Sequence, residues 1–172
     1  MLKEVNNFTL LESSIYALTI INPTNLMGVM GAGIALILAQ RFPTMKDQYR
    51  ALVKANELKQ GCVVLYAARE IEIKVVSLPT KYHWKNDSDL NLIKAGLETL
   101  VHQAQMLGPI AMPRIGAGLG RLNWEEDVLP LVEDFAGHYP YDISVCHGKK
   151  MSVVHPHPHH ENGMSWILEY KK

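Results

Sequence analysis

Cysteine is scarce in this 172-residue chain, and no sign of charge is in excess. Its two cysteines, Cys62 and Cys146, both lie in apolar segments, which favours buried free thiols in a reducing compartment over a disulfide framework. Lys plus Arg and Asp plus Glu number 17 each, so the formal net charge is zero. A global basic field for non-specific nucleic-acid binding is therefore excluded, whereas a local basic rim stays compatible with this balance.

Long apolar runs are absent as well. No run approaches the roughly 18 residues that a membrane-spanning helix needs, and residues 1–7 lack the basic-then-apolar order of a signal peptide. We therefore expect a soluble, cytoplasmic protein. Hydrophobic residues still make up 48% of the chain, which is enough for one domain of ordinary size with a substantial core.

Strand patterns and helix patterns alternate along the chain. Short apolar, β-branched runs predict strands, and apolar residues spaced three or four apart predict helices. The predicted strands are 15–22, 62–67, 71–78, 109–112 and 141–146, and the predicted helices are 34–42, 44–56, 89–106 and 124–136. The short connection at 68–70 predicts a hairpin. The order indicates an α/β domain in which helices cover both faces of one mixed sheet.

Three details of the predicted helices can be checked directly. The first helix is apolar nearly all round, so we expect it to be deeply buried. Ser88 is the expected N-cap of the third helix. Asn123 is the expected cap of the fourth, with Glu126 three residues later completing a capping box.

Two glycine-rich segments stand at predicted strand ends, each ahead of a predicted helix: residues 28–33 (GVMGAG) and 116–120 (GAGLG). Glycine lets the backbone bend tightly and bring its N–H groups close to an anion. A helix N-terminus adds unpaired N–H donors, and ligands of open α/β sheets bind at the carboxyl ends of strands. Together the segments predict a pocket that grips two phosphates or a diphosphate. For either segment alone, a turn needed only for packing is an equal alternative.

Neither segment has the spacing of a common nucleotide-binding motif. The first lacks the G-x-G-x-x-G pattern of a Rossmann loop, and no G-K-[ST] ending indicates an NTP-hydrolysing P-loop.

Four polar side chains near these segments are candidates for chemistry. Asn22 and Asn25 flank a turn at Pro23, where amide groups either match ribose hydroxyls or form the turn. Lys81 stands in a polar and aromatic loop; with a lowered pKa it can attack a sugar C1 carbon or act as an acid or base, and a solvated lysine is the alternative. Arg114 either pairs with a phosphate or faces a carboxylate on the adjacent helix.

The C-terminal segment, residues 148–172, differs from the rest of the chain. Four of the eight histidines stand within residues 155–160 (HPHPHH), and the intervening prolines favour an extended chain. The pattern allows a metal site. Only Glu161 is close enough to complete one, so an exposed loop between strands at 152–154 and 165–170 is the simpler interpretation.

Three separated segments resemble the macrodomain family, in order and with spacing intact. Residues 20–36 (IINPTNLMGVMGAGIAL) and then 41–43 (RFP) are similar to its first ligand loop and following helix. Residues 110–124 (IAMPRIGAGLGRLNW) resemble its second, phosphate-gripping loop. Residues 78–85 (LPTKYHWK) are similar to a segment of one branch: the antitoxin macrodomains that remove ADP-ribose from DNA bases, related to the terminal ADP-ribose protein glycohydrolases.

The resemblance implies a three-layer α/β/α macrodomain that spans residues 1–172 and binds ADP-ribose with its diphosphate between the two loops. It implies that Lys81 is catalytic and that Asn22 assists by orienting the ribose, with no metal or cofactor required. The implied ligand-binding residues are Asn25, Gly28, Val29, Met30, Gly31, Ala32, Gly33, Ile34, Thr80, Pro113, Arg114, Ile115, Gly116, Ala117, Gly118, Leu119 and Gly120.

The resemblance has departures. Protein-directed relatives carry an Asp directly after the Gly-Leu of the second loop, where this chain has Gly120. A two-residue Lys–Asp mechanism in that form is therefore excluded, and the match shifts toward the DNA-directed antitoxins. The Gly-Asp or Gly-Asn pair that reads adenine has no clear match, since Asn7 is too far from Asn22, and the His-rich segment has no counterpart.

These implications lead us to expect an ADP-ribosyl glycohydrolase that cleaves the bond between the distal ribose C1 carbon and a nucleobase or side chain of DNA, RNA or protein. A binding module without turnover and an ADP-ribose 1″-phosphate phosphatase are the alternatives. We expect a monomer whose partners are an ADP-ribosylated macromolecule and a cognate ADP-ribosyltransferase, with no membrane partner.

Overall fold

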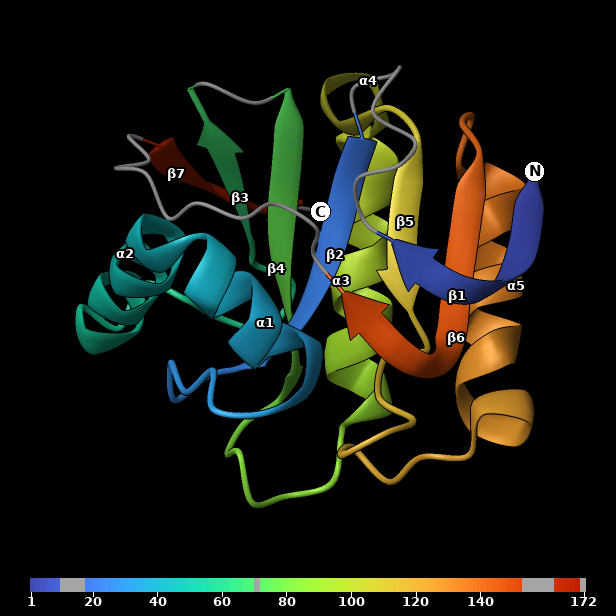
Figure 1. Cartoon of the computed structure of the whole chain (residues 1–172), viewed down its shortest axis with the longest axis horizontal. Coiled ribbons are helices and arrows are strands. Elements are labelled where there is room, and N and C mark those ends of the chain that lie inside the picture. The colour runs from blue at the N-terminus through green and yellow to red at the C-terminus, as the bar shows by residue number, and fades with distance from the viewer. Residues whose placement is uncertain (10–17, 70–71, 153–162, 171–172) are drawn as a thin grey trace.

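The computed structural model describes residues 1–9, 18–69, 72–152 and 163–170 (Figure 1). Over these residues, none of the helices has the length and apolarity that crossing a bilayer requires. The predicted histidine segment at 155–160 lies outside the described residues, as does the end of the strand expected at 152–154.

A seven-stranded sheet in the order β1-β6-β5-β2-β4-β3-β7 forms the centre of the fold. Its strands are β1 (Leu2–Thr9), β2 (Leu18–Asn25), β3 (Val63–Ala68), β4 (Ile73–Lys81), β5 (Ile110–Pro113), β6 (Ile143–Ser152) and β7 (Gly163–Leu168). The pairs from β1 to β4 in this order are parallel, whereas β3 runs antiparallel to both β4 and β7. The predicted mixed sheet and the predicted hairpin are therefore confirmed.

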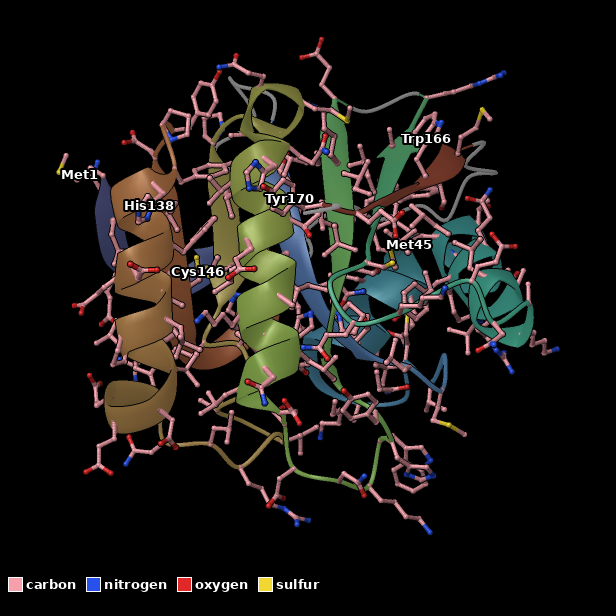
Figure 2. The ribbon with its side chains drawn as sticks, turned by 180° about the vertical axis from the view of Figure 1, so that it is seen from behind. Met1, Met45, His138, Cys146, Trp166 and Tyr170 are labelled. Carbon is pink, nitrogen blue, oxygen red and sulfur yellow. The ribbon has the colours of Figure 1, made fainter. Side chains whose placement is uncertain are left out.

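Helices cover both faces of this sheet, which gives the predicted three-layer α/β/α architecture. One face carries α1 (Gly33–Arg41) and α2 (Pro43–Lys54), and the other carries α3 (Leu90–His102) and α5 (Leu129–His138) (Figures 1 and 2). Two short elements, α4 (Ala104–Leu107) and the π-helical turn η1 (Trp124–Val128), complete the set. Adjacent residues of β2 serve opposite layers, because Ile20 packs with the α1 and α2 side and Ile21 with the α3 and α5 side.

The first helix corrects one expectation. Ile34, Ala35, Leu38 and Ala39 of α1 are buried, but Leu36 is exposed, so the helix is buried on one face rather than all round. Pro43 begins α2 directly after it, at a position where the missing N–H costs nothing.

The predicted capping residues are partly right. Asp89, not Ser88, is the N-cap of α3, since its carboxylate accepts from the N–H groups of Asn91 and Leu92. A break at residue 103 separates α3 from α4, so the helix predicted over 89–106 is two helices. Both cysteines are buried free thiols, as expected.

The cap of the last helix also differs in one partner. Asn123 Oδ1 accepts from the N–H of Glu126 at 3.1 Å, as predicted. The return bond comes from the Asp127 carboxylate, which accepts from the Asn123 N–H at 2.8 Å, rather than from the Glu126 side chain. The chain then passes through η1 before it becomes α-helical.

Candidate functional site

The carboxyl ends of three adjacent parallel strands meet at one edge of the sheet. There β2 leads into the first glycine loop (residues 26–32), β4 into an aromatic loop (residues 82–89) and β5 into the second glycine loop (residues 114–123) (Figure 1). Loops at this edge of an open sheet form ligand sites. The topology therefore brings the predicted segments together.

The first glycine loop is built by one asparagine. Asn25 Oδ1 accepts from the N–H groups of Met27 and Val29, both at 3.1 Å, and its Nδ2 donates to Val29 O at 2.7 Å. Its side chain thus forms the turn, which was one of its two sequence-based interpretations. Gly33 begins α1 with φ 58°, a left-handed conformation that favours glycine.

This loop presents open donors. The N-cap position of α1 is Ala32, which supplies no side-chain cap. Over the described part of the chain, no acceptor is bonded to the N–H groups of Gly31 or Ala32, and both residues are exposed. Exposed, unpaired N–H groups at the start of a helix are suited to binding an anion.

The second glycine loop is tightly wound on itself. Gly116 has φ 76°, and a Cβ there would lie 2.8 Å from Ile93 Cδ1, so only glycine fits. Internal bonds join Ala117 N–H to Arg114 O and Leu122 N–H to Gly116 O. Among the described residues, none accepts from the N–H groups of the exposed Gly118 and Leu119.

The second glycine loop comes close to Gly33, which directly follows the first glycine loop. A Cβ built on Gly33 would lie 3.7 Å from Leu119 Cδ1. The loops therefore approach each other here, and open N–H groups stand on both of them. The helix after the second loop begins at Trp124 with Asn123 as its cap, as predicted. The N–H groups of Asn123 and Glu126 are bonded there, so these two donors are not open to a ligand as the sequence suggested.

Lys81 is the last residue of β4 and is only 8% exposed. Its Nζ donates to the backbone oxygen of Leu119 at 3.1 Å, which places the ammonium group against the second glycine loop. Burial, and then the nearby Arg121 guanidinium, lower the pKa of Lys81 below its ordinary value, while Asp87 opposes them. The site thus holds a buried lysine whose pKa is lower than that of a solvated lysine.

Asn22 is fully buried in β2, opposite Ser77 of β4 in the register of the sheet. Its Nδ2 lies 3.4 Å from Ser77 Oγ and 4.0 Å from Met30 Sδ. Its Oδ1 is buried without a hydrogen-bond partner in the described structure. Buried acceptors are almost always paired in folded proteins, so this oxygen marks a position where a donor is missing.

Two other predicted ligand residues have side chains that are used within the protein. Thr80 is buried, and its hydroxyl donates to Thr24 O at 3.3 Å. The Arg114 guanidinium lies 3.2 Å from the Glu4 carboxylate and 3.6 Å from that of Glu125. Of the two interpretations of Arg114, the structure therefore favours the one in which it faces a carboxylate on the adjacent helix, here Glu125 of η1. At residues 113–120 we therefore expect the backbone, rather than the Arg114 side chain, to meet a ligand.

Sequence reasoning missed the residues that tie the aromatic loop to the second glycine loop. Ser88 N–H donates to Gly120 O at 2.8 Å, and Arg121 pairs with Asp87 at 3.2 Å. These partners lie more than 30 residues apart, so no local pattern could have revealed them.

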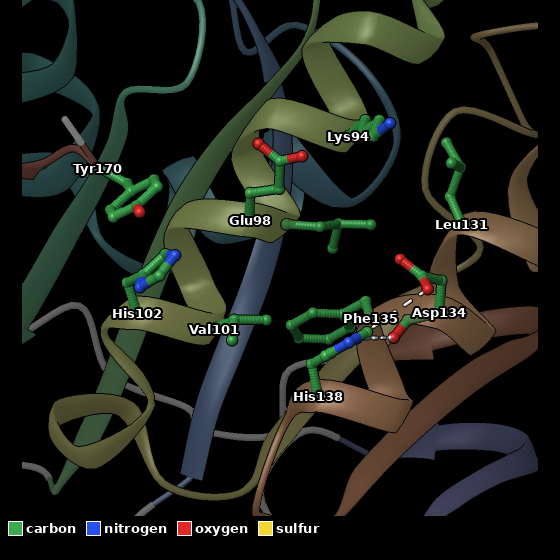
Figure 3. Close-up of a pocket in the computed structure, with 10 residues that line it drawn as sticks. Lys94, Glu98, Val101, His102, Leu131, Asp134, Phe135, His138 and Tyr170 are labelled. Atoms are coloured by element: carbon green, nitrogen blue, oxygen red, sulfur yellow. Dashed lines mark hydrogen bonds and ion pairs between the residues drawn. The ribbon is translucent and has the colours of Figure 1, made fainter. Parts of the chain in front are cut away.

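A separate groove of about 390 Å³ lies between α3 and α5 (Figure 3). It is lined by Lys94, Leu97, Glu98, Val101, His102, Leu131, Asp134, Phe135, His138 and Tyr170. None of the predicted site residues lines it. The His102 ring stacks on Tyr170 at 3.5 Å between centroids, and His138 Nδ1 lies 2.8 Å from Asp134 O, so its rings are engaged with neighbours.

Comparison with known proteins points to a single family. The Macro domain model matches residues 21–129. A DNA ADP-ribosyl glycohydrolase of Thermus aquaticus is 39% identical over 124 residues, which cover 68% of this chain and 33% of that protein. The chain thus spans about a third of the length of the curated relatives it matches.

Two solved structures are similar to this one. The macrodomain of Mycobacterium tuberculosis DarG has a TM-score of 0.74 and 31% identity, covering 85% of this chain and 97% of that one. Thermosipho africanus DarTG in complex with ADP-ribose has a TM-score of 0.67 and 26% identity, and the match covers 78% of this chain and 39% of that one. The similarity extends over most of the fold described above.

Proposed function

Because the chain belongs to the Macro domain family, we propose that it binds ADP-ribose and hydrolyses the bond between the distal ribose C1 carbon and a nucleobase of DNA. A solved relative is in complex with ADP-ribose, and curated relatives are named DNA ADP-ribosyl glycohydrolases. The observation that carries the proposal is the buried Lys81, held against the second glycine loop at the same sheet edge as Asn22.

The glycine loops supply the binding energy of this proposal. Open N–H groups at Gly31, Ala32, Gly118 and Leu119 stand on two loops that come close at Gly33. A diphosphate between them accepts these donors and lies near the positive end of α1. A ribose hydroxyl at Asn22 Oδ1 removes the cost of an unpaired buried acceptor, about 1–3 kcal/mol.

The chemistry of this proposal centres on a neutral lysine. The lowered pKa of Lys81 leaves more of it uncharged, with a lone pair on Nζ. Attack forms a bond from Nζ to C1 while the bond from C1 to the base breaks, and the base leaves with the electron pair and takes up the proton that Nζ loses. Water then attacks C1, the bond from Nζ to C1 breaks, and a proton from the water restores the amine as ADP-ribose leaves. Fixed dipoles and positioning contribute most of the acceleration.

The activity implies a partner. ADP-ribosylated DNA has to be made by an ADP-ribosyltransferase, and we propose that such an enzyme is the counterpart of this chain in the cytoplasm. The chain acts as a monomer in this scheme, since the site is assembled from the loops of one sheet edge.

The test compares wild type, Lys81→Ala and the control Lys94→Ala, whose lysine is exposed on α3. Release of free ADP-ribose is measured from ADP-ribosylated single-stranded DNA and from ADP-ribosylated protein. We expect Lys81→Ala to lose activity by roughly 10²–10⁴-fold, with ADP-ribose affinity by calorimetry within a few-fold of wild type and Lys94→Ala unaffected. Undiminished release by Lys81→Ala removes this lysine from its role.

The same assay separates the alternatives. Binding of ADP-ribose without release from any conjugate would establish a binding module. Phosphate release from ADP-ribose 1″-phosphate, with no cleavage of either conjugate, would establish a phosphatase.

A further inference from the structure

Three consecutive ring side chains follow Lys81 directly: Tyr82, His83 and Trp84. Tyr82 is 48% exposed and Trp84 50% exposed, although large aromatic side chains are usually buried in a chain with a core of this size. These rings stand on the aromatic loop, which projects from the strand-end edge of the sheet beside the glycine loops (Figure 1). Their exposure is therefore located at the mouth of the proposed site.

The aromatic loop is held in one conformation. Its base is closed by Asp89 N–H, which donates to Thr80 O at 2.8 Å. Its tip is a turn in which Asn86 N–H donates to His83 O at 3.0 Å and Lys85 N–H donates to His83 Nδ1 at 3.1 Å. A loop backbone fixed in this way loses little conformational entropy when a partner binds.

The rings also carry a cation. The His83 ring stacks on Trp84, with centroids 5.7 Å apart and planes at 24°. Lys85 Nζ lies 5.1 Å from the centre of the Trp84 ring. Over the described ranges, no carboxylate pairs with Lys85, so its charge is available to a ligand.

We propose that Tyr82, His83, Trp84 and Lys85 form an aromatic platform that binds the nucleotides next to the modified base of single-stranded DNA. This inference rests on the proposed function. Exposed aromatic faces beside a cation are the usual means of holding unpaired bases and their phosphates. Since the chain has no net charge, its hold on DNA comes from stacking at this loop rather than from a broad basic field.

The depth of Lys81 favours a single strand over a duplex. Lys81 is only 8% exposed, whereas the neighbouring rings stand out into solvent. A base linked to ADP-ribose has to leave its stack to bring C1 down to Nζ, and this costs least in unpaired DNA. The neighbouring bases then meet the platform.

The experiment measures kcat/KM on two substrates, an ADP-ribosylated single-stranded oligonucleotide and an ADP-ribosylated mononucleoside. Tyr82→Ala and Trp84→Ala each remove one ring, and Trp166→Ala, a 46% exposed ring on the edge strand β7, is the matched control. We expect each platform variant to lower kcat/KM about tenfold on the oligonucleotide. In both platform variants, we expect kcat/KM on the mononucleoside and the affinity for free ADP-ribose to stay at the wild-type level. Trp166→Ala should match wild type in every measurement.

Binding tests the same inference without turnover. In a Lys81→Ala background, affinity for the oligonucleotide exceeds that for the mononucleoside, and the excess is lost in Trp84→Ala. With Lys85 as the single contact to a backbone phosphate of the DNA, a fourfold rise in salt weakens oligonucleotide binding about two- to threefold more than mononucleoside binding. Lys85→Ala abolishes that dependence.

The outcomes separate the two proposals. Equal wild-type kcat/KM and equal affinities for oligonucleotide and mononucleoside overturn the platform and leave the glycohydrolase intact. If Trp84→Ala lowers kcat/KM equally on the oligonucleotide and on the mononucleoside, the ring only supports Lys81. If it lowers kcat/KM equally on ADP-ribosylated protein, the platform does not select nucleic acid. Either result overturns the inference. No release from any conjugate overturns the proposed function, and the affinities then decide on the platform.

Discussion

A methyl group at Gly120 provides a sharp test of how the second glycine loop is packed. A Cβ at this position would overlap Ser88 Oγ and the Gly116 carbonyl oxygen, and would lie 2.8 Å from the Gly116 carbonyl carbon. The same backbone oxygen accepts from Leu122 N–H. Because one obstacle is backbone, the loop has to shift when Gly120 becomes Ala.

The size of the effect follows from this overlap. Overpacking that forces a backbone shift costs roughly 1–3 kcal/mol. A loss of about 2 kcal/mol lowers Tm by about 4–8 °C in a chain of this size. Gly118 provides the control, since a Cβ there meets nothing within 4 Å. Gly118→Ala is therefore expected to leave Tm unchanged or slightly raised.

The assay is thermal unfolding of wild type, Gly120→Ala, Gly120→Asp and Gly118→Ala without ligand, followed by calorimetric titration with ADP-ribose. We expect Gly120→Ala to lower Tm and to weaken ADP-ribose binding at least tenfold, and Gly120→Asp to be at least as damaging because its side chain is larger. Wild-type Tm for Gly120→Ala, or an equal loss of Tm in Gly118→Ala, would refute the packing described for this loop.

Three further predictions concern single side chains. Arg121→Gln removes a positive charge that lowers the pKa of Lys81. The rising limb of the pH–rate profile, which reports deprotonation of this lysine in the proposed mechanism, should therefore move to higher pH. A shift to lower pH would contradict the prediction. Asn123→Ala removes the side chain that accepts from Glu126 N–H, which costs about 1 kcal/mol of stability. Scanning calorimetry should therefore show Tm lowered by about 2–4 °C, and an unchanged Tm would contradict this role of Asn123. Burial raises the pKa of Cys146 to about 12, so a thiol reagent reacts with it only after unfolding; rapid reaction of the native protein excludes this burial.

The central strands could be predicted from short apolar runs that are buried on both faces of the sheet, such as Ile20 and Ile21 in β2 and Val75 and Val76 in β4. β4, buried at all but one position, is the clearest example. β1 was missed for the opposite reason. It pairs with β6 alone at the edge of the sheet, and its segment LKEVNNFT is rich in polar residues that such a strand tolerates.

The ends of helices depended on contacts that spacing does not reveal. Apolar residues continue at helical spacing through Val101, Ala104 and Leu107, so the break at residue 103 leaves no trace in the pattern. The π-helical turn η1 is similarly hidden, since it arises from bonds of Asp127 and Val128 to the Asn123 carbonyl oxygen.

At the site, local composition revealed the loops but not their partners. The glycine segments and Lys81 stand out because glycine and a lysine after an apolar strand are unusual locally. That Arg114 is occupied by Glu4, 110 residues away, depends on the sheet bringing β1 and β5 to opposite sides of β6. Nor could composition show whether the Asn25 amide forms a turn or meets a ligand.

The ties around Lys81 also determine which parts of the cleft can separate. Lys81, Ser88 and Asp87 each bond to the stretch 119–121, so the proposed nucleophile and the proposed phosphate-binding loop form a single block. The first glycine loop is joined to the same block by Leu26 N–H, which donates to Lys81 O at 3.1 Å, and a Cβ built on Gly33 would lie 3.7 Å from Leu119 Cδ1. A nucleotide that widens the cleft would therefore displace residues after Leu26, rather than separate Lys81 from residues 119–121.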